Sequence, residues 1–177
     1  MKTLYLIKHA KSNWSIPDTR DFERPISKSG AKDVNTISSY LMIQEILPDI
    51  MLSSCALRAQ ETTDLLADKI DFQGKKIFLE ELYNTTAEDI QAIIMAQDDA
   101  HNSIFLIAHN PHISELINLV TDEHFSKMPS MGLVALNFEI DEWSELETKK
   151  GKIDFFIFPK QFKYYMPKQI RTTLNRG

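Results

Sequence analysis

The chain has 177 residues, of which 43% are hydrophobic and 25% charged, so it fits one domain of ordinary size with a sizeable core. The formal net charge of -5 argues against a general nucleic-acid binder, and no apolar run approaches the ~18 residues of a membrane span. The single cysteine, Cys55, excludes an internal disulfide, and the apolar run at 4–7 is too short for a signal peptide. We therefore expect a cytoplasmic protein with no nucleic-acid or membrane partner.

Short apolar runs alternate with longer stretches of helical period, which is the pattern of an α/β domain. Helices are predicted at 29–44, at 56–70, after Thr85 and from Asn110 to about Val120. Strands are predicted at 4–7, 50–53, 77–79, 103–108, 133–140 and 152–158.

Local signals refine this order. Thr85 and Glu88 have the spacing of a capping box, and Asn110 followed by Pro111 is typical of a helix start. The strand at 103–108 is the most apolar and is expected at the centre of the sheet, whereas the last two strands indicate an edge hairpin joined by a polar loop. The predicted fold is a three-layer α/β/α sandwich around a mostly parallel central sheet.

The C-terminal segment differs in charge from the rest of the chain. Residues 160–177 carry five basic and no acidic side chains, which leaves residues 1–159 at about -10, because -5 minus +5 is -10. We expect a catalytic domain at 1–159 and a basic tail at 160–177, with the tail partly laid on the domain and partly frayed.

Three predicted strands end in residues suited to anion chemistry. The first is followed by His9, the second by Arg58 in the next helical turn, and the central strand by His109. Ligands of open α/β sheets collect beyond the carboxyl ends of the strands, so these groups are expected at one edge of the sheet. Each alone would be an ordinary surface or hydrogen-bonded residue, but together they indicate a phosphoryl site.

The motifs at these positions match a known family. Residues 4–12 resemble the strand and R-H-[GA] signature of the histidine phosphatase superfamily, which has the phosphoglycerate mutase-like fold. Residues 21–27, 52–62, 82–83 and 108–111 are similar to the SixA branch of phosphohistidine phosphatases. The resemblance runs from residue 1 to Pro159.

The resemblance implies that His9 attacks phosphorus and forms a phosphohistidine intermediate that water hydrolyses, with no cofactor and no metal. Arg58 and a protonated His109 would hold the phosphoryl oxygens. The family has Arg where this chain has Lys8, which keeps the charge but loses the bidentate fork. Lys8, Ser12 and Asn110 are expected as further phosphate ligands. Lys11 is a candidate to compensate for the missing arginine, with a solvated loop position as an equal alternative.

The leaving-group acid is the least defined part of the prediction. Glu81, or its neighbour Glu80, follows the third strand and is a candidate, but an exposed loop carboxylate is an equal alternative. An imidazole leaving group demands less of an acid than an alkoxide does, so a missing acid would favour phosphohistidine. The stretch between Leu79 and Ser103 leaves no room for a lid domain, which favours an open site for a phosphorylated protein.

The expected partner is accordingly a phosphohistidine-bearing phosphotransfer domain in a signalling pathway, or else a small phosphorylated substrate, and the chain is expected to be a monomer or weak oligomer. Two alternatives within phosphate chemistry stay open: a small-molecule phosphomonoesterase, and a phosphate-binding module impaired by Lys8. A cysteine phosphatase is disfavoured because Arg58 follows Cys55 by three positions and not six. A metal site is disfavoured because His109 and His112 make an incomplete ligand set.

Overall fold

The structure is a computed structural model, and it describes residues 1–165. Its centre is a six-stranded sheet in the order β3-β2-β4-β1-β5-β6. The strands are β1 (Lys2–Lys8), β2 (Ile50–Ser54), β3 (Lys75–Leu79), β4 (Ser103–Ala108), β5 (Leu133–Phe138) and β6 (Lys152–Ile157).

The parallel part of the sheet is the part that positions the site. The strand β4 lies between β1 and β2 and pairs with both in parallel register, which confirms the predicted central strand. The strands β5 and β6 form the antiparallel hairpin at the edge, as predicted. The connection between them is less polar than expected, because a 3₁₀ turn, η3 (Trp143–Glu147), buries Trp143 and Leu146.

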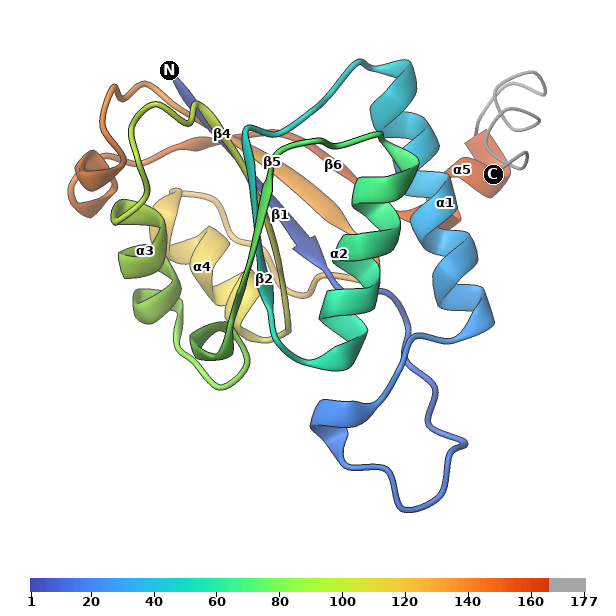
Figure 1. Cartoon of the computed structure of the whole chain (residues 1–177). Coiled ribbons are helices and arrows are strands. Elements are labelled where there is room, and N and C mark those ends of the chain that lie inside the picture. The colour runs from blue at the N-terminus through green and yellow to red at the C-terminus, as the bar shows by residue number, and fades with distance from the viewer. Residues whose placement is uncertain (166–177) are drawn as a thin grey trace.

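Helices cover both faces of the sheet, which makes the predicted three layers (Figure 1). The helices α1 (Lys28–Ile43) and α2 (Leu57–Lys69) pack on one face around Val34, Ile37 and Leu66. On the other face lie α3 (Ala87–Met95) and α4 (His112–Val120), whose amphipathic sides join a second apolar cluster. Burying each such aliphatic side chain contributes about 1.5 to 3 kcal/mol, so both clusters hold the strand ends firmly in place.

Two predicted helix starts need correction by one residue or more. The cap of α3 is Thr86, whose hydroxyl accepts the Asp89 amide, and not Thr85, whose hydroxyl is spent on a backbone carbonyl. The helix α4 begins at His112 after a cis Asn110-Pro111 bond, and Pro111 occupies the cap position. The Asn110 side chain therefore does not cap the helix.

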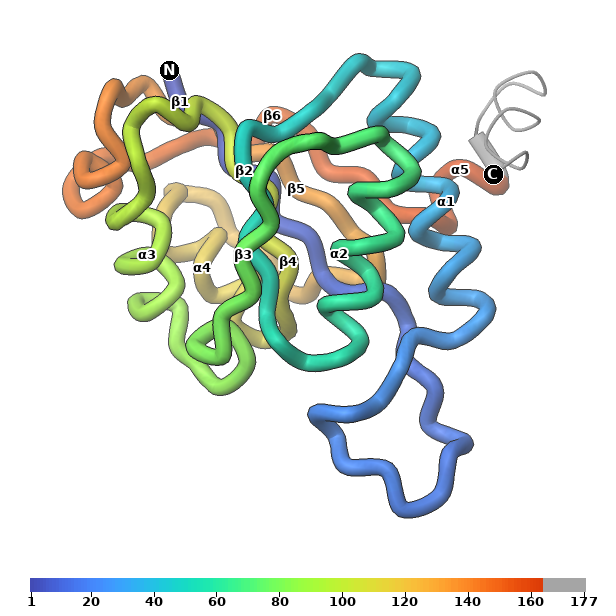
Figure 2. Tube along the Cα trace, viewed as in Figure 1, coloured from blue at the N-terminus to red at the C-terminus, as the bar shows by residue number. Residues whose placement is uncertain are grey.

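The segment between β1 and α1 projects beyond the carboxyl edge of the sheet, where it forms the dark-blue loop of Figures 1 and 2. It carries a 3₁₀ turn, η1 (Asp21–Glu23). A second turn, η2 (Glu80–Leu82), and α3 fill the stretch between β3 and β4, so within residues 1–165 that stretch holds no lid domain.

The chain continues from β6 into α5 (Pro159–Tyr165), where Phe162 is buried against the aromatic ring of Tyr40 on α1. The remaining tail prediction, residues 166–177, lies outside the described residues. Among residues 1–165 no helix is both long and apolar enough to cross a membrane.

Candidate active site

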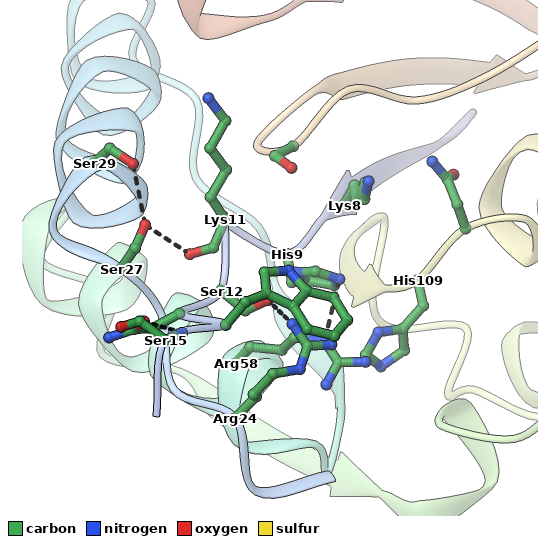
Figure 3. Close-up of a pocket in the computed structure, with 14 residues that line it drawn as sticks. Lys8, His9, Lys11, Ser12, Ser15, Arg24, Ser27, Ser29, Arg58 and His109 are labelled. Carbon is green, nitrogen blue, oxygen red and sulfur yellow. Dashed lines mark hydrogen bonds between the residues drawn. The ribbon is translucent and has the colours of Figure 1, made fainter. Parts of the chain in front are cut away.

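Three strand ends meet at one cavity of about 680 Å³, as the sequence predicts. His9 follows β1, Arg58 lies in the first turn of α2 after β2, and His109 follows β4; all three line the cavity (Figure 3). The centroids of the two imidazole rings are 4.9 Å apart, and the Arg58 Nε atom lies 3.3 Å from His9 Nε2. The parallel register of β1, β4 and β2 causes this convergence.

The ring of His9 is fixed in one tautomer by the backbone. Its Nδ1 lies 2.7 Å from the carbonyl oxygen of Ala10, which can only accept, so Nδ1 carries the proton and Nε2 keeps its lone pair. Burial, opposed by that hydrogen bond and aided by the charge of Arg58, lowers the pKa of His9 to about 4. At neutral pH the imidazole is therefore an uncharged potential nucleophile with its free nitrogen beside a guanidinium.

The guanidinium of Arg58 is buried and used on three sides. Its Nε donates toward His9 Nε2, its Nη1 donates to the backbone oxygen of Asp21 at 2.7 Å, and its Nη2 reaches the Asp21 carboxylate at 3.1 Å. Tyr83 lies beside it, with 5.9 Å between the guanidinium carbon and the ring centroid. The group is thus held in a fixed orientation at the cavity wall, as an anion receptor requires.

The surroundings of His109 disfavour the protonated ring that the resemblance implies. Burial, with the nearby His9 and the charge of Arg58, lowers the pKa of His109 to about 3. Its Nε2 is 2.8 Å from the hydroxyl of Ser54, and its buried Nδ1 has no hydrogen-bond partner among residues 1–165. The ring can therefore offer one neutral N–H to a ligand, although it adds no charge.

The three remaining predicted phosphate ligands, Lys8, Ser12 and Asn110, all line the same cavity. Burial and the charges of Lys127 and Arg58 lower the pKa of Lys8. Ser12 is already engaged, because its hydroxyl accepts from Arg24, and the Asn110 amide donates to the Met128 carbonyl at 2.7 Å. Lys8 is therefore the ligand of this group whose polar atom is least committed to the protein.

Solved structures share this architecture. A protein of Agrobacterium tumefaciens assigned to the SixA phosphohistidine phosphatases has a TM-score of 0.77 and 26% identity, covering 89% of this chain and 98% of that one. This chain thus shares the phosphoglycerate mutase-like fold of a SixA-type phosphohistidine phosphatase. The protein histidine phosphatase SixA solved with tungstate has a TM-score of 0.79 at 16% identity, covering 90% of this chain and 99% of that one, and shows the same fold.

Sequence comparison adds one relative and no family. No family model matches the sequence of this chain. An uncharacterized chloroplast protein of Arabidopsis thaliana is 27% identical over 159 residues, which cover 85% of this chain and 72% of that relative.

The structure does not bring the proposed acid to the cavity. Glu81 and Glu80 lie on η2 with exposed side chains, and neither lines the cavity. Among residues 1–165, the lining includes four basic side chains and no carboxylate. The basic residues are Lys8, Lys11, Arg24 and Arg58.

Sequence reasoning assigned no role to four residues at or behind this wall. Trp14 and Arg24 line the cavity, whereas Asp21 and Tyr83 lie behind the arginines. The Arg24 guanidinium is buried, lines the cavity and stacks on the exposed ring of Trp14 at 3.4 Å from its centroid. Asp21 contacts both arginines, and the Tyr83 hydroxyl donates to it at 2.6 Å. Asp21, Arg24 and Tyr83 all stood in the motifs that carry the resemblance, which was the available signal.

The geometry does not support a cysteine phosphatase or a metal site. Cys55 does not line the cavity, and burial together with the charges of Glu80 and Glu81 raises the pKa of its thiol, the opposite of an activated nucleophile. Among residues 1–165 no three His, Cys, Asp or Glu side chains gather as a metal site would need.

Proposed function

We propose that this protein is a histidine phosphatase that hydrolyses phosphohistidine on a protein, with His9 as the nucleophile. The observation that carries the proposal is the composition of the cavity wall. Among the residues that the structure describes, it presents a neutral imidazole nitrogen, buried or half-buried cations and no carboxylate. Such a wall holds a dianionic phosphoryl group but supplies no carboxylic acid for a leaving alkoxide.

In the first step the Nε2 lone pair of His9 forms a bond to phosphorus. The bond from phosphorus to the substrate imidazole breaks, and its electron pair stays on that imidazole nitrogen, which takes its proton from solvent. Arg58 donates to the phosphoryl oxygens, with Lys8 and the Nδ1–H of His109 as further donors. Burial, together with the like charges around it, lowers the pKa of His9, so its lone pair is available at neutral pH.

In the second step a water oxygen bonds to phosphorus and the bond to His9 Nε2 breaks. The electron pair returns to the imidazole, and the water proton passes to the released phosphate or to solvent. The hydrogen bond from Nδ1 to Ala10 keeps the ring in one orientation through both steps.

A protein substrate is supported by the openness of the cavity. Nothing between β3 and β4 in the described residues forms a lid, so a phosphohistidine on a protein surface could reach His9. A phosphotransfer domain of a signalling pathway is the partner class we infer, and the single unpaired Cys55 supports a cytoplasmic location.

The test compares three substrates that differ in their need for an acid: a phosphohistidine-bearing phosphotransfer protein, para-nitrophenyl phosphate and glycerol phosphate. Phosphate release is expected from the first two and not from glycerol phosphate, whose alkoxide needs a proton. His9→Ala should abolish release, whereas His124→Ala, which removes an exposed ring elsewhere, should not.

Other outcomes would replace the proposal. Efficient release from glycerol phosphate would favour a small-molecule phosphomonoesterase with an acid that the wall does not supply. Binding of tungstate without turnover of any of the three substrates would favour the impaired phosphate-binding module.

A further inference from the structure

Asp21 lies between the two buried arginines of the site. Its Oδ1 atom accepts from Arg24 Nη2 at 2.5 Å, and its Oδ2 atom accepts from Arg58 Nη2 at 3.1 Å and from the Tyr83 hydroxyl at 2.6 Å. Its backbone oxygen accepts a further bond from Arg58 at 2.7 Å. Four hydrogen bonds from three side chains therefore converge on this one residue.

Asp21 does not itself reach the phosphoryl cavity. Both arginines line the cavity and Asp21 does not, although its side chain is 48% exposed. It is the only acidic residue that forms an ion pair with either arginine in residues 1–165. The Tyr83 and Arg24 hydrogen bonds and the charge of Arg58 outweigh burial and hold the pKa of Asp21 well below its usual range, so the carboxylate stays charged.

Two guanidinium groups this close repel each other, and each has other orientations open to it. A carboxylate that accepts from both offsets the repulsion and fixes the two planes through charge-assisted hydrogen bonds. We propose that Asp21 is a positioning residue that holds the guanidinium groups of Arg24 and Arg58 side by side, so that both face a bound phosphoryl group. The proposal rests on the proposed function.

The remaining contacts of Arg24 show why positioning matters. Its Nη1 donates to the Ser12 hydroxyl and its face lies on the ring of Trp14, while its Nε is buried without a partner among residues 1–165. A buried unpaired N–H is costly unless a ligand satisfies it. Asp21 thus fixes a guanidinium whose Nε donor has no protein partner among residues 1–165.

The test measures tungstate affinity calorimetrically at pH 7 for the wild type and for Asp21→Asn, which keeps the shape and removes the charge. Electrostatics alone predicts tighter tungstate binding by the variant, because a negative charge near the anion disappears. Positioning predicts the opposite sign, a loss of about 10- to 100-fold in affinity and in kcat/KM. Tighter or unchanged binding by the variant would overturn the proposal.

Glu23→Gln is the matched control, since Glu23 lies on the same turn η1 and, in the described part of the chain, forms an ion pair only with the exposed Arg20. It removes the same charge two residues away and should leave affinity and kcat/KM unchanged. If the control weakened binding as much as Asp21→Asn, general loss of the turn would explain both, and the positioning role would be refuted.

A double-mutant cycle separates positioning from a structural role. If Asp21 acts through Arg24, Asp21→Asn should cost less in an Arg24→Ala background than in the wild type, whereas a structural role gives additive losses and overturns the proposal. Tungstate binding by the wild type without phosphohistidine hydrolysis would overturn the proposed function. The tungstate affinities of the variants would still decide the role of Asp21. A wild type that neither binds tungstate nor hydrolyses would overturn both.

Discussion

Each end of β1 carries a buried or half-buried lysine, and the two ammonium groups differ in their hydrogen-bond partners. At the amino end Lys2 is 2% exposed, and its ammonium group donates to the carbonyls of Asp99 and His101 and to the side chain of Asn102, over the ring of Trp143. At the carboxyl end Lys8 is half-buried beside other cations, and no ion pair to it is formed within residues 1–165.

The difference separates a structural cation from a binding cation. Lys2 has acceptors from the protein for all three of its donors, so its charge is satisfied before any ligand arrives. Lys8 and Arg58 lie close enough for their charges to disfavour each other, an arrangement that an anionic ligand would stabilise. A cluster of cations that lack anionic partners in a cavity therefore locates the site better than a single buried cation does.

The largest effect is expected for Arg58→Lys. Lysine keeps the charge but cannot place one donor beside His9 and two on Asp21, so kcat/KM for a phosphohistidine protein should fall about 100-fold or more. Phosphate release kinetics measure this. Arg20→Lys, at a side chain that is 79% exposed, is the control and should be silent. Wild-type kcat/KM in Arg58→Lys would show that charge alone suffices at this end of the sheet.

The opposite result is expected at the amino end for Lys2→Met. The variant leaves buried acceptors without a donor while keeping the length of the side chain, so the free energy of unfolding should fall by about 2 kcal/mol. Urea denaturation measures the loss, and kcat/KM of the folded variant should equal that of the wild type. A fall in kcat/KM without a fall in stability would break the distinction between the two ends.

The sequence predicts the fold well because the fold follows from repeated local patterns. Apolar runs mark each strand, and the parallel order of the first four strands brings His9, Arg58 and His109 together without any knowledge of side-chain contacts. The errors fall at element ends and in connections. The cap of α3 lies one residue after the predicted one, and η3 buries Trp143 in a connection that the sequence predicts to be polar.

The parts of the site that sequence reasoning misses come from the loop between β1 and α1. Asp21 and Arg24 sit in a stretch with no regular period, so nothing local predicts that the loop folds back onto Arg58. The charge state of His109 also needs the structure, since its pKa is lowered by burial and by neighbours distant in sequence. Glu81 shows the reverse error, because following a strand does not place a side chain in the cavity.

The smallest effect is expected for Lys8→Arg, which tests the binding end of β1 directly. Burial and the charges of Lys127 and Arg58 lower the pKa of Lys8 from 10.5, so the wild type should lose a cation, and tungstate affinity, as the pH rises toward that lowered value. Arginine stays protonated there and adds a fork, so the variant should keep its affinity at alkaline pH and bind roughly 3- to 10-fold more tightly at pH 7. Titration calorimetry across the alkaline range distinguishes the two. Lys127→Arg keeps the neighbouring charge outside the cavity lining and should follow the wild type. An equal alkaline loss in Lys8→Arg would mean that Lys8 is not the group that titrates, and that this lysine is as structural as Lys2.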